Sequence, residues 1–388
     1  MFHKPPLVSV AHARDLARKR LPRSIFNYLD GGNEAEYTVA ANRHAFSEVT
    51  FRPRAAVAYP SRNLETTILG SKLSMPVMIA PTGIIRTVHR GGELAAARAA
   101  GKAGIGIGIS TLSGYPIEEI TAATPGPVWY QLYFAGGRRG AEVAIDRAAR
   151  FGCTALILTM DTAAVVGKEA TLRDGPLPTN VNIGNFLQHA PQALLHPRWA
   201  LDFILDGMKL QVPNVRLEPD GPPLSLAEAA AGYRANTPTW ADLEWIRKRF
   251  PGKIVVKGIL RPEDAVLALE HGADAIVVSN HGGNALDSTP ATLRVLPSIV
   301  AAVGHRTEVL MDGGVHRGAD VVKAVALGAK AVLIGRAYGW GLAARGEQGV
   351  TEILNMFRSG MNDTLALLGC PGVEALDRSY VDVPANWP

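Results

Sequence analysis

Eight short apolar runs recur along the 388-residue chain, and segments with helical character separate them. The runs are rich in Val, Ile and Leu and do not alternate with polar residues, which is typical of parallel strands buried on both faces. Eight strand–helix units of this kind predict an α/β protein with a closed (β/α)₈ barrel, a TIM barrel, rather than an open sheet. The eight runs are residues 75–80, 105–110, 128–133, 155–160, 253–257, 275–279, 308–311 and 331–334.

Two stretches stand outside this repeat. An N-terminal helical extension covers residues 8–45, and the interval between the fourth and fifth strands is far longer than an ordinary crossover. We place both in a single domain, 1–388, and assign 168–238 as an insertion, because long insertions in compact domains are often lids. Apolar segments at 185–187 and 199–205 favour a lid or a subunit contact, and peripheral membrane contact through 180–215 is the less favoured alternative.

Composition limits the partners of such a chain. It has no apolar run of about 18 residues and no signal-peptide pattern, so we expect a cytoplasmic protein, or one on the inner face of the membrane if the insertion contacts lipid. The net charge of +5 is diffuse, which argues against a nucleic-acid partner. The two cysteines, Cys153 and Cys370, lack metal-ligand spacing, so we expect buried thiols and no metal site.

Polar residues stand where each predicted strand ends. The carboxyl ends of barrel strands open on one face, so these residues should converge although they are distant in sequence. Glycine turns at 313–314 and 335 follow the seventh and eighth strands, the usual phosphate position of a barrel, and Arg336 adds a permanent charge. The sequence therefore predicts a phosphorylated ligand at the carboxyl-terminal face.

His281 lies near the centre of this predicted face, in a Gly-rich turn after the run 275–279. Asp161 either holds the His281 imidazole as a carboxylate partner or caps the next turn, and spacing alone leaves both interpretations open. Lys257 either stabilises negative charge on a cofactor or extends to solvent.

Several motifs together identify a resemblance. The chain is similar over essentially its whole length to the FMN-dependent α-hydroxy-acid oxidases and dehydrogenases, the family of glycolate oxidase, L-lactate dehydrogenase and mandelate dehydrogenase. The resemblance implies an oxidoreductase with FMN that converts the CH–OH group of a 2-hydroxy carbonyl compound to the 2-oxo product. The matching stretches are 80–83, 131–133, 256–258, 279–283, 312–315 and 334–336.

The resemblance also implies roles for individual residues. His281 takes a substrate proton with support from Asp161, Tyr28 and Tyr133 hydrogen-bond the substrate, and Lys257 stabilises the reduced flavin. Lys168 and Asn284 complete the substrate-binding set. The residues implied to hold FMN are Pro81, Thr82, Gly83, Ser110, Gln131, Thr159, Lys257, Ser279, Asp312, Gly313, Gly314, Val315, His316, Gly335 and Arg336.

Two departures from the family pattern concern the substrate. The family pairs the substrate carboxylate with two arginines, and those positions hold Asn284 and Lys168 here. Asn cannot form the paired charge-assisted bonds of Arg, and Lys approximates them only as a point charge. We therefore expect a substrate with less need for carboxylate recognition, such as a hydroxy-lactone or ester. Asn284 and residues 238–240 are similar to mycofactocin-associated members of the family.

Other interpretations remain open at the level of sequence. A non-redox FMN barrel enzyme, similar to isopentenyl diphosphate isomerase, and a non-catalytic flavin-binding protein are the alternatives. The electron acceptor is oxygen, a quinone or a protein carrier, and the apolar insertion and basic charge favour a dehydrogenase. The resemblance implies a homo-oligomer, a tetramer or octamer.

Overall fold

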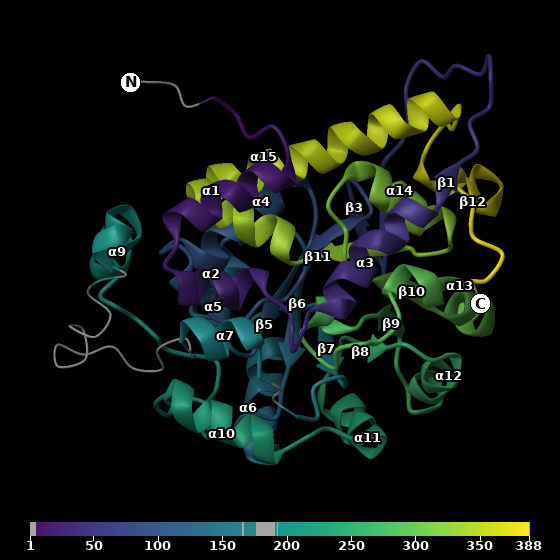
Figure 1. Ribbon diagram of the computed structural model, residues 1–388. Coiled ribbons are helices and arrows are strands. Elements are labelled where there is room, and N and C mark those ends of the chain that lie inside the picture. Colours follow the sequence, from purple (N-terminus) through teal and green to yellow (C-terminus); the bar gives the residue numbers. More distant parts are fainter. Residues whose placement is uncertain (1–4, 165–166, 176–190, 192, 388) are drawn as a thin grey trace.

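A closed barrel of eight parallel strands forms the centre of the computed structural model (Figure 1). The structure describes residues 5–164, 167–175, 191 and 193–387. Strands follow one another around the barrel in chain order, and β11 closes on β4 through the pairs Val332↔Val77 and Ile334↔Ile79. The predicted TIM barrel is confirmed. Its strands are β4 (Val77–Ile79), β5 (Ile107–Ser110), β6 (Val128–Leu132), β7 (Ala155–Thr159), β8 (Lys253–Ile259), β9 (Ala275–Val278), β10 (Glu308–Met311) and β11 (Ala331–Ile334).

Large side chains fill the barrel interior. Met78, Trp129 and Leu333 are buried in one apolar cluster with inward-facing residues of neighbouring strands. Ile68 and Leu73 join this cluster from the hairpin of β2 (Thr66–Ile68) and β3 (Ser71–Leu73), which immediately precedes β4. The hairpin therefore plugs the amino-terminal end of the barrel, and a site for a ligand has to form at the other end.

Helices connect the strands and cover the outside of the barrel. A short antiparallel pair, β1 (Thr50–Phe51) with β12 (Val381–Asp382), joins the C-terminal tail to the segment after the N-terminal extension. The covering helices are α4 (Gly92–Ala103), α5 (Ile117–Ala122), α6 (Gly137–Arg150), α11 (Trp240–Arg249), α12 (Pro262–Glu270), α13 (Thr292–Val303), α14 (Gly318–Ala326) and α15 (Arg336–Leu368). Single helical turns are η1 (Ile85–Thr87), η2 (His281–Gly283), η3 (Val373–Ala375) and η4 (Arg378–Tyr380).

The N-terminal extension consists of three helices, α1 (Val10–Arg20), α2 (Arg23–Asp30) and α3 (Tyr37–Glu48). Ser9 begins α1 by accepting a hydrogen bond from the His12 amide at 3.0 Å. The helix buries Ala13 and Ala17 and lies beside α15 (Figure 1). From this support, α2 and α3 extend to the carboxyl-terminal face of the barrel, where α3 contacts η2.

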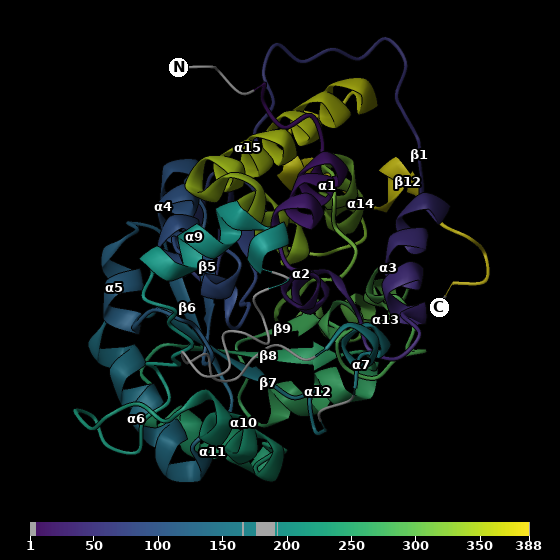
Figure 2. The ribbon, with the colours of Figure 1, turned by 60° about the vertical axis from the view of Figure 1, so that its left-hand side comes forward.

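The insertion contains α7 (Glu169–Asp174), α9 (Pro197–Leu205) and α10 (Leu226–Ala235). Ion pairs hold α9 to the barrel: Arg86 and Asp206 approach to 2.7 Å, and Arg90 and Asp202 to 3.1 Å. Figure 2 shows α9 and α10 on the same side of the molecule as α5 and α6. The apolar segment 185–187 lies outside the described residues. Within the described part of the chain, no helix is long and apolar enough to cross a membrane.

Candidate active site

A cavity of about 400 Å³ opens at the carboxyl ends of the barrel strands. Every strand contributes to its wall directly or through the loop that follows it, as the sequence predicts for a barrel. Asp161 and Ser279 do not line the cavity themselves, but each contacts a residue that does. The residues inferred from the sequence that line the cavity are Tyr28, Pro81, Thr82, Gly83, Ser110, Gln131, Tyr133, Thr159, Lys168, Lys257, His281, Asn284, Asp312, Gly313, Gly314, Val315, His316, Gly335 and Arg336.

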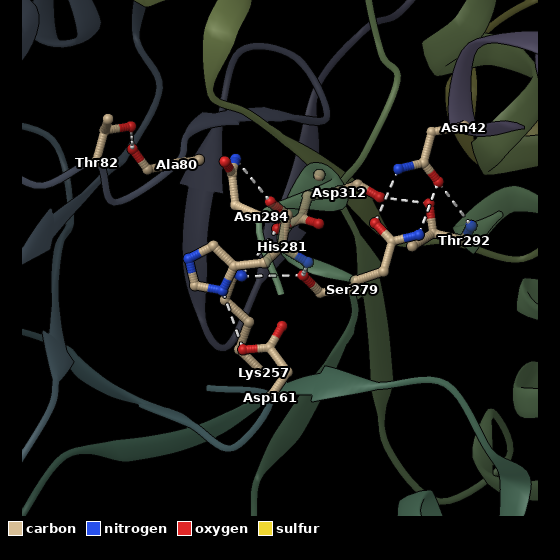
Figure 3. Close-up of polar contacts among 12 residues, drawn as sticks. Asn42, Ala80, Thr82, Asp161, Lys257, Ser279, His281, Asn284, Thr292 and Asp312 are labelled. Atoms are coloured by element: carbon tan, nitrogen blue, oxygen red, sulfur yellow. Dashed lines mark hydrogen bonds and ion pairs between the residues drawn. The ribbon is translucent and has the colours of Figure 1, made fainter. Parts of the chain in front are cut away.

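His281, in this wall, forms a hydrogen-bonded couple with Asp161 behind it (Figure 3). Nδ1 of His281 lies 3.0 Å from Oδ1 of Asp161, and Nε2 lies 3.4 Å from the Tyr133 hydroxyl. Burial acts to raise the pKa of Asp161, but the charges of His281 and Lys257 outweigh it and lower the pKa. The ionised carboxylate favours the tautomer with hydrogen on Nδ1, which leaves the Nε2 lone pair available as a base.

Unusual backbone geometry places both members of the couple. His281 has a φ of 58°, a left-handed conformation that is uncommon outside glycine, and the Ser279 hydroxyl accepts its amide hydrogen at 3.0 Å. Gly258 makes room for Asp161: a Cβ at Gly258 would lie 2.6 Å from the Asp161 Cβ, and its φ is 105°. The register shift of β8 at this glycine therefore accommodates the carboxylate.

Lys257 is a buried cation beside this couple. Its Nζ donates to the Ser279 hydroxyl oxygen at 2.9 Å and lies 3.3 Å from Oδ2 of Asp312. Burial acts to lower the pKa of Lys257, but the carboxylates of Asp312 and Asp161 raise it above its ordinary value. Its side chain is only 4% exposed, so the interpretation in which it extends to solvent does not hold.

Several buried polar atoms of the cavity wall have no hydrogen-bond partner among the described residues. Gln131 orients its side chain by accepting the Ser110 hydroxyl hydrogen on Oε1 at 3.1 Å, which leaves Nε2 without a partner. Thr159 Oγ1 and Asp312 Oδ1 are also unpartnered. Because buried polar atoms are nearly always paired, these atoms indicate where a polar ring system binds.

The opposite end of the cavity has the character of an anion site. Gly313 and Gly314 have φ values of 94° and 78°, and a Cβ at Gly314 would lie 2.4 Å from the Asn42 carbonyl oxygen. Only glycine therefore fits this turn, which leaves its backbone amides unobstructed. Burial lowers the pKa of the adjacent His316 to about 3, with a further contribution from Arg43, so His316 is neutral.

Arg336 and Lys168 bind backbone carbonyls of the N-terminal extension, and Arg336 also binds one in the His281 turn. Arg336 donates to the carbonyls of Asp30, Gly282 and Gly31 at 2.8, 2.6 and 2.9 Å. Lys168 donates to those of Tyr28 and Gly31 at 3.2 and 3.0 Å. Burial, followed by the charge of Arg336, lowers the pKa of Lys168 to about 7, so its ammonium is partly deprotonated at neutral pH.

Asn284 brings no cation to the cavity wall. Its Nδ2 donates to the His281 carbonyl at 3.2 Å, which leaves Oδ1 buried and without a hydrogen-bond partner among the described residues. The Asn33 side chain fixes the same turn by donating to the carbonyls of Asn284 and Ala285 at 3.0 and 2.6 Å.

Other lining residues lie outside the strand-end pattern on which the sequence analysis relied. Tyr233 comes from helix α10 of the insertion, and nothing in the local sequence separates it from an ordinary helical tyrosine. Trp240, in the segment that resembles mycofactocin-associated proteins, stacks on His271 with ring centres 6.2 Å apart and does not line the cavity. The further lining residues include Arg14, Arg43, Leu112, Thr162, Tyr233 and Trp340.

Comparison with known proteins identifies the family. The FMN-dependent dehydrogenase family matches residues 17–383. The chain belongs to this family. This FMN-dependent dehydrogenase is 43% identical to the pre-mycofactocin synthase of Mycobacterium tuberculosis, over 98% of its own length and 95% of the relative. It is 39% identical to the (S)-mandelate dehydrogenase of Pseudomonas putida, over 97% and 94% of the two chains.

A solved structure supports the same assignment. The monotopic membrane protein (S)-mandelate dehydrogenase superposes with a TM-score of 0.89 at 40% identity, over 97% of this chain and 100% of that one. Like (S)-mandelate dehydrogenase, this FMN-dependent dehydrogenase is an enzyme that oxidises CH–OH donors. The cavity fits the cofactor: Gln131 Nε2 and Thr159 Oγ1 suit the carbonyls and N–H of the flavin ring, and the 313–314 turn suits the phosphate.

Proposed function

We propose that this enzyme oxidises an uncharged 2-hydroxy carbonyl compound, such as a 2-hydroxy amide, ester or lactone, rather than a 2-hydroxy acid. The observation that carries the proposal is Asn284 in the cavity wall, whose Oδ1 has no hydrogen-bond partner among the described residues. A carboxylate offers only acceptor oxygens and also carries a negative charge, so it is the least favourable partner for this atom; an ester or lactone likewise only accepts but has no charge. An amide N–H would instead donate to it, which makes the 2-hydroxy amide the favoured member of the class.

Lys168 supports the same conclusion. A buried carboxylate needs a full opposite charge and several hydrogen bonds to offset its desolvation. Lys168 already directs hydrogen bonds to two backbone carbonyls, and its pKa of about 7 leaves the amine partly uncharged at neutral pH. An uncharged substrate makes no comparable demand on this side chain.

The surrounding residues suit removal of a proton from the substrate. Nε2 of His281 takes the proton, and Asp161 stabilises the resulting imidazolium through Nδ1. Burial raises the pKa of Tyr133 well above its ordinary value, so its hydroxyl remains a hydrogen donor for the substrate. Tyr28 donates to the Gly83 carbonyl at 2.8 Å and closes this side of the site. FMN, when bound, would supply the oxidising capacity by taking up the two electrons and the second hydrogen that the CH–OH group loses.

Relatives provide a precedent for an amide ligand. A solved arginine-to-leucine variant of mandelate oxidase, 34% identical to this chain with a TM-score of 0.80, was crystallised with 2-hydroxy-phenylacetamide. That ligand keeps the 2-hydroxy carbonyl group and lacks the carboxylate charge.

Anaerobic bleaching of the flavin tests the proposal. Mandelate, its methyl ester and its amide (2-hydroxy-phenylacetamide) share the reacting carbon and ring, so their rates isolate the effect of the carbonyl substituent. We expect the amide to reduce the flavin about tenfold or more faster than the acid, with the ester between them. Faster reduction by the acid than by both neutral compounds would contradict the proposal. Asn284→Arg is the matched variant, and it should shift the preference toward the acid.

We also infer that the insertion attaches the enzyme to a membrane surface. Leu201, Ile204 and Leu205 on α9 are 59%, 49% and 62% exposed, and Leu194 and Leu195 beside them are 80% and 76% exposed. Several exposed apolar side chains on one segment are typical of an interaction site. In a sedimentation assay with anionic vesicles, we expect the native enzyme to pellet with the vesicles. A variant that combines Leu201→Ser, Ile204→Ser and Leu205→Ser should stay in the supernatant. Leu367→Ser, at a 79% exposed position on α15, is the control; equal sedimentation of all three proteins would contradict the inference.

A further inference from the structure

Tyr233 reaches the active-site cavity from helix α10, although the rest of that helix covers the outside of the barrel. We propose that Tyr233 is a positioning residue that holds the Tyr133 hydroxyl toward His281, so that the insertion completes the active site. The proposal rests on the roles given above to His281 and Tyr133, and it adds a residue that the strand-end pattern does not include.

The contact between the two tyrosines is direct. Their ring centres lie 4.6 Å apart at an interplanar angle of 62°, an edge-to-face arrangement. The Tyr233 hydroxyl also lies near the side chains of Thr162 and Tyr133. The rings of the pair are therefore in contact and their hydroxyls are neighbours, so a rotation of Tyr133 would disturb the ring contact.

Tyr133 needs such support because its contact with His281 is weak. The 3.4 Å between its hydroxyl and Nε2 exceeds the usual hydrogen-bond range, so His281 alone does not fix the ring. The hydrogen bond from the Tyr133 amide to Thr111 Oγ1, at 2.9 Å, fixes only the backbone. Tyr233 contacts the side chain itself.

Helix α10 is seated on the loop that carries Tyr133. A Cβ at Gly232 would lie only 1.7 Å from the Ala135 carbonyl oxygen, so the helix backbone lies directly against residue 135. Asn236 Nδ2 donates to the Gly232 carbonyl at 2.7 Å, and Leu226 and Ala229 are buried in one cluster with Ala135. Gly232 contacts Ala135, which lies two residues after Tyr133. This contact therefore fixes the position of Tyr233, the neighbour of Gly232, relative to Tyr133.

We infer an order of donors for the two hydroxyls. Burial raises the pKa of both tyrosines, so both are neutral and each donates one hydrogen. If Tyr233 donates to the Tyr133 oxygen, as we infer, the Tyr133 hydrogen is left to point to Nε2 of His281 or to a substrate oxygen. Removing the Tyr233 hydroxyl removes this preference while the ring contact remains.

The test compares Tyr233→Phe, Tyr133→Phe and the double variant in the FMN-loaded enzyme. The measurement is the rate constant of anaerobic flavin reduction as a function of pH, with FMN content recorded for each protein. We expect Tyr233→Phe to lower the rate constant about five- to twentyfold, and the double variant to be no slower than Tyr133→Phe alone. Tyr115→Phe is the matched control, because its hydroxyl donates to the Arg90 carbonyl at 2.7 Å outside the cavity.

An unchanged rate constant in Tyr233→Phe would overturn the proposal. So would a double variant whose fold-decrease in rate constant equals the product of the two single decreases. Gly232→Ala is a second test of the proposal, since it displaces α10 from Ala135. The decrease that it causes in the rate constant of flavin reduction should likewise disappear in a Tyr133→Phe background. His281→Asn separates this question from the proposed function. Full activity of that variant would refute the role of His281 as base, whereas the coupling between Tyr133 and Tyr233 is decided by the double variant.

Discussion

At the scale of single residues, Gly258 controls the couple of His281 and Asp161, although it does not line the cavity. Its missing side chain leaves room for Asp161, which in turn bonds Nδ1 of His281. The resemblance to the family identifies His281 and Asp161, but the reason for a glycine at 258 emerges only when β7 and β8 are adjacent. The constraint is steric and tertiary, so no local pattern contains it.

Gly258→Ala should therefore lower the rate of flavin reduction in the same way as a substitution of Asp161 itself. The new Cβ would press on the Asp161 side chain at 2.6 Å, and we expect the rate constant of flavin reduction to fall about tenfold to a hundredfold with FMN retained. Stopped-flow reduction measures it. Gly272→Ala is the control, since its φ of 92° carries the same backbone strain but its Cβ would meet no atom within 4 Å. Equal losses in both variants would show that backbone strain, not Asp161, is responsible.

Lys168 should give the binding of acids a pH dependence. Its pKa of about 7 is lowered from the ordinary value, so the cation is present below pH 7 and is lost as the pH rises through it. The apparent Kd of mandelate should therefore increase from pH 6 to pH 8.5, whereas that of the neutral amide should stay nearly constant. Titration of flavin absorbance measures both constants. In Lys168→Arg the dependence should vanish, and an unaltered dependence there would assign it to another group.

At the scale of elements, the sequence predicts the regular units better than the segments that complete the site. All eight apolar runs become barrel strands, because an unbroken run of β-branched and aliphatic residues suits a strand buried on both faces. The insertion has no such repeat. Helix α10 is positioned by the approach of Gly232 to Ala135, a contact between distant segments, and so the place of Tyr233 was not foreseen.

The turn after β9 depends on α3 in the same way. The Asp287 carboxylate accepts the amide hydrogens of Tyr37 and Thr38, at 3.1 and 2.7 Å, where α3 begins. Asp287→Ala should lower the free energy of unfolding by about 0.5–2 kcal/mol, the usual cost of a lost cap, and weaken substrate binding because Asn284 is on the same loop. Chemical denaturation and flavin titration measure the two effects.

Asp377→Ala is a suitable control for this element. Asp377 accepts the Ser379 amide hydrogen at 2.8 Å at an exposed turn on the C-terminal tail. It should lose stability without weakening substrate binding. If Asp287→Ala likewise left binding unchanged, the link between α3 and the substrate site would be wrong.

At the scale of the whole molecule, three distant parts of the chain meet at Arg336. It begins α15 directly after the last barrel strand, and its guanidinium bonds carbonyls of the N-terminal extension and of the His281 turn. From the sequence, Arg336 is expected to bind phosphate. Its bonds show an additional structural task, which sequence could not reveal because backbone carbonyls carry no residue-specific signal.

Arg336→Lys should therefore destabilise the protein even without FMN. Three carbonyl oxygens share the planar guanidinium, and an ammonium with a different shape cannot reach all of them, so we expect the apoprotein to lose about 1–3 kcal/mol. Arg43→Lys, at an exposed position lining the same cavity, should leave apoprotein stability nearly unchanged. Denaturant unfolding of each apoprotein, repeated with saturating FMN, separates structural support from cofactor binding. The stability that FMN adds depends only on its affinity, whereas the stability of the apoprotein does not involve FMN. If Arg336→Lys weakens FMN binding and leaves the apoprotein intact, Arg336 serves the cofactor alone, and the joining of the three segments does not depend on it.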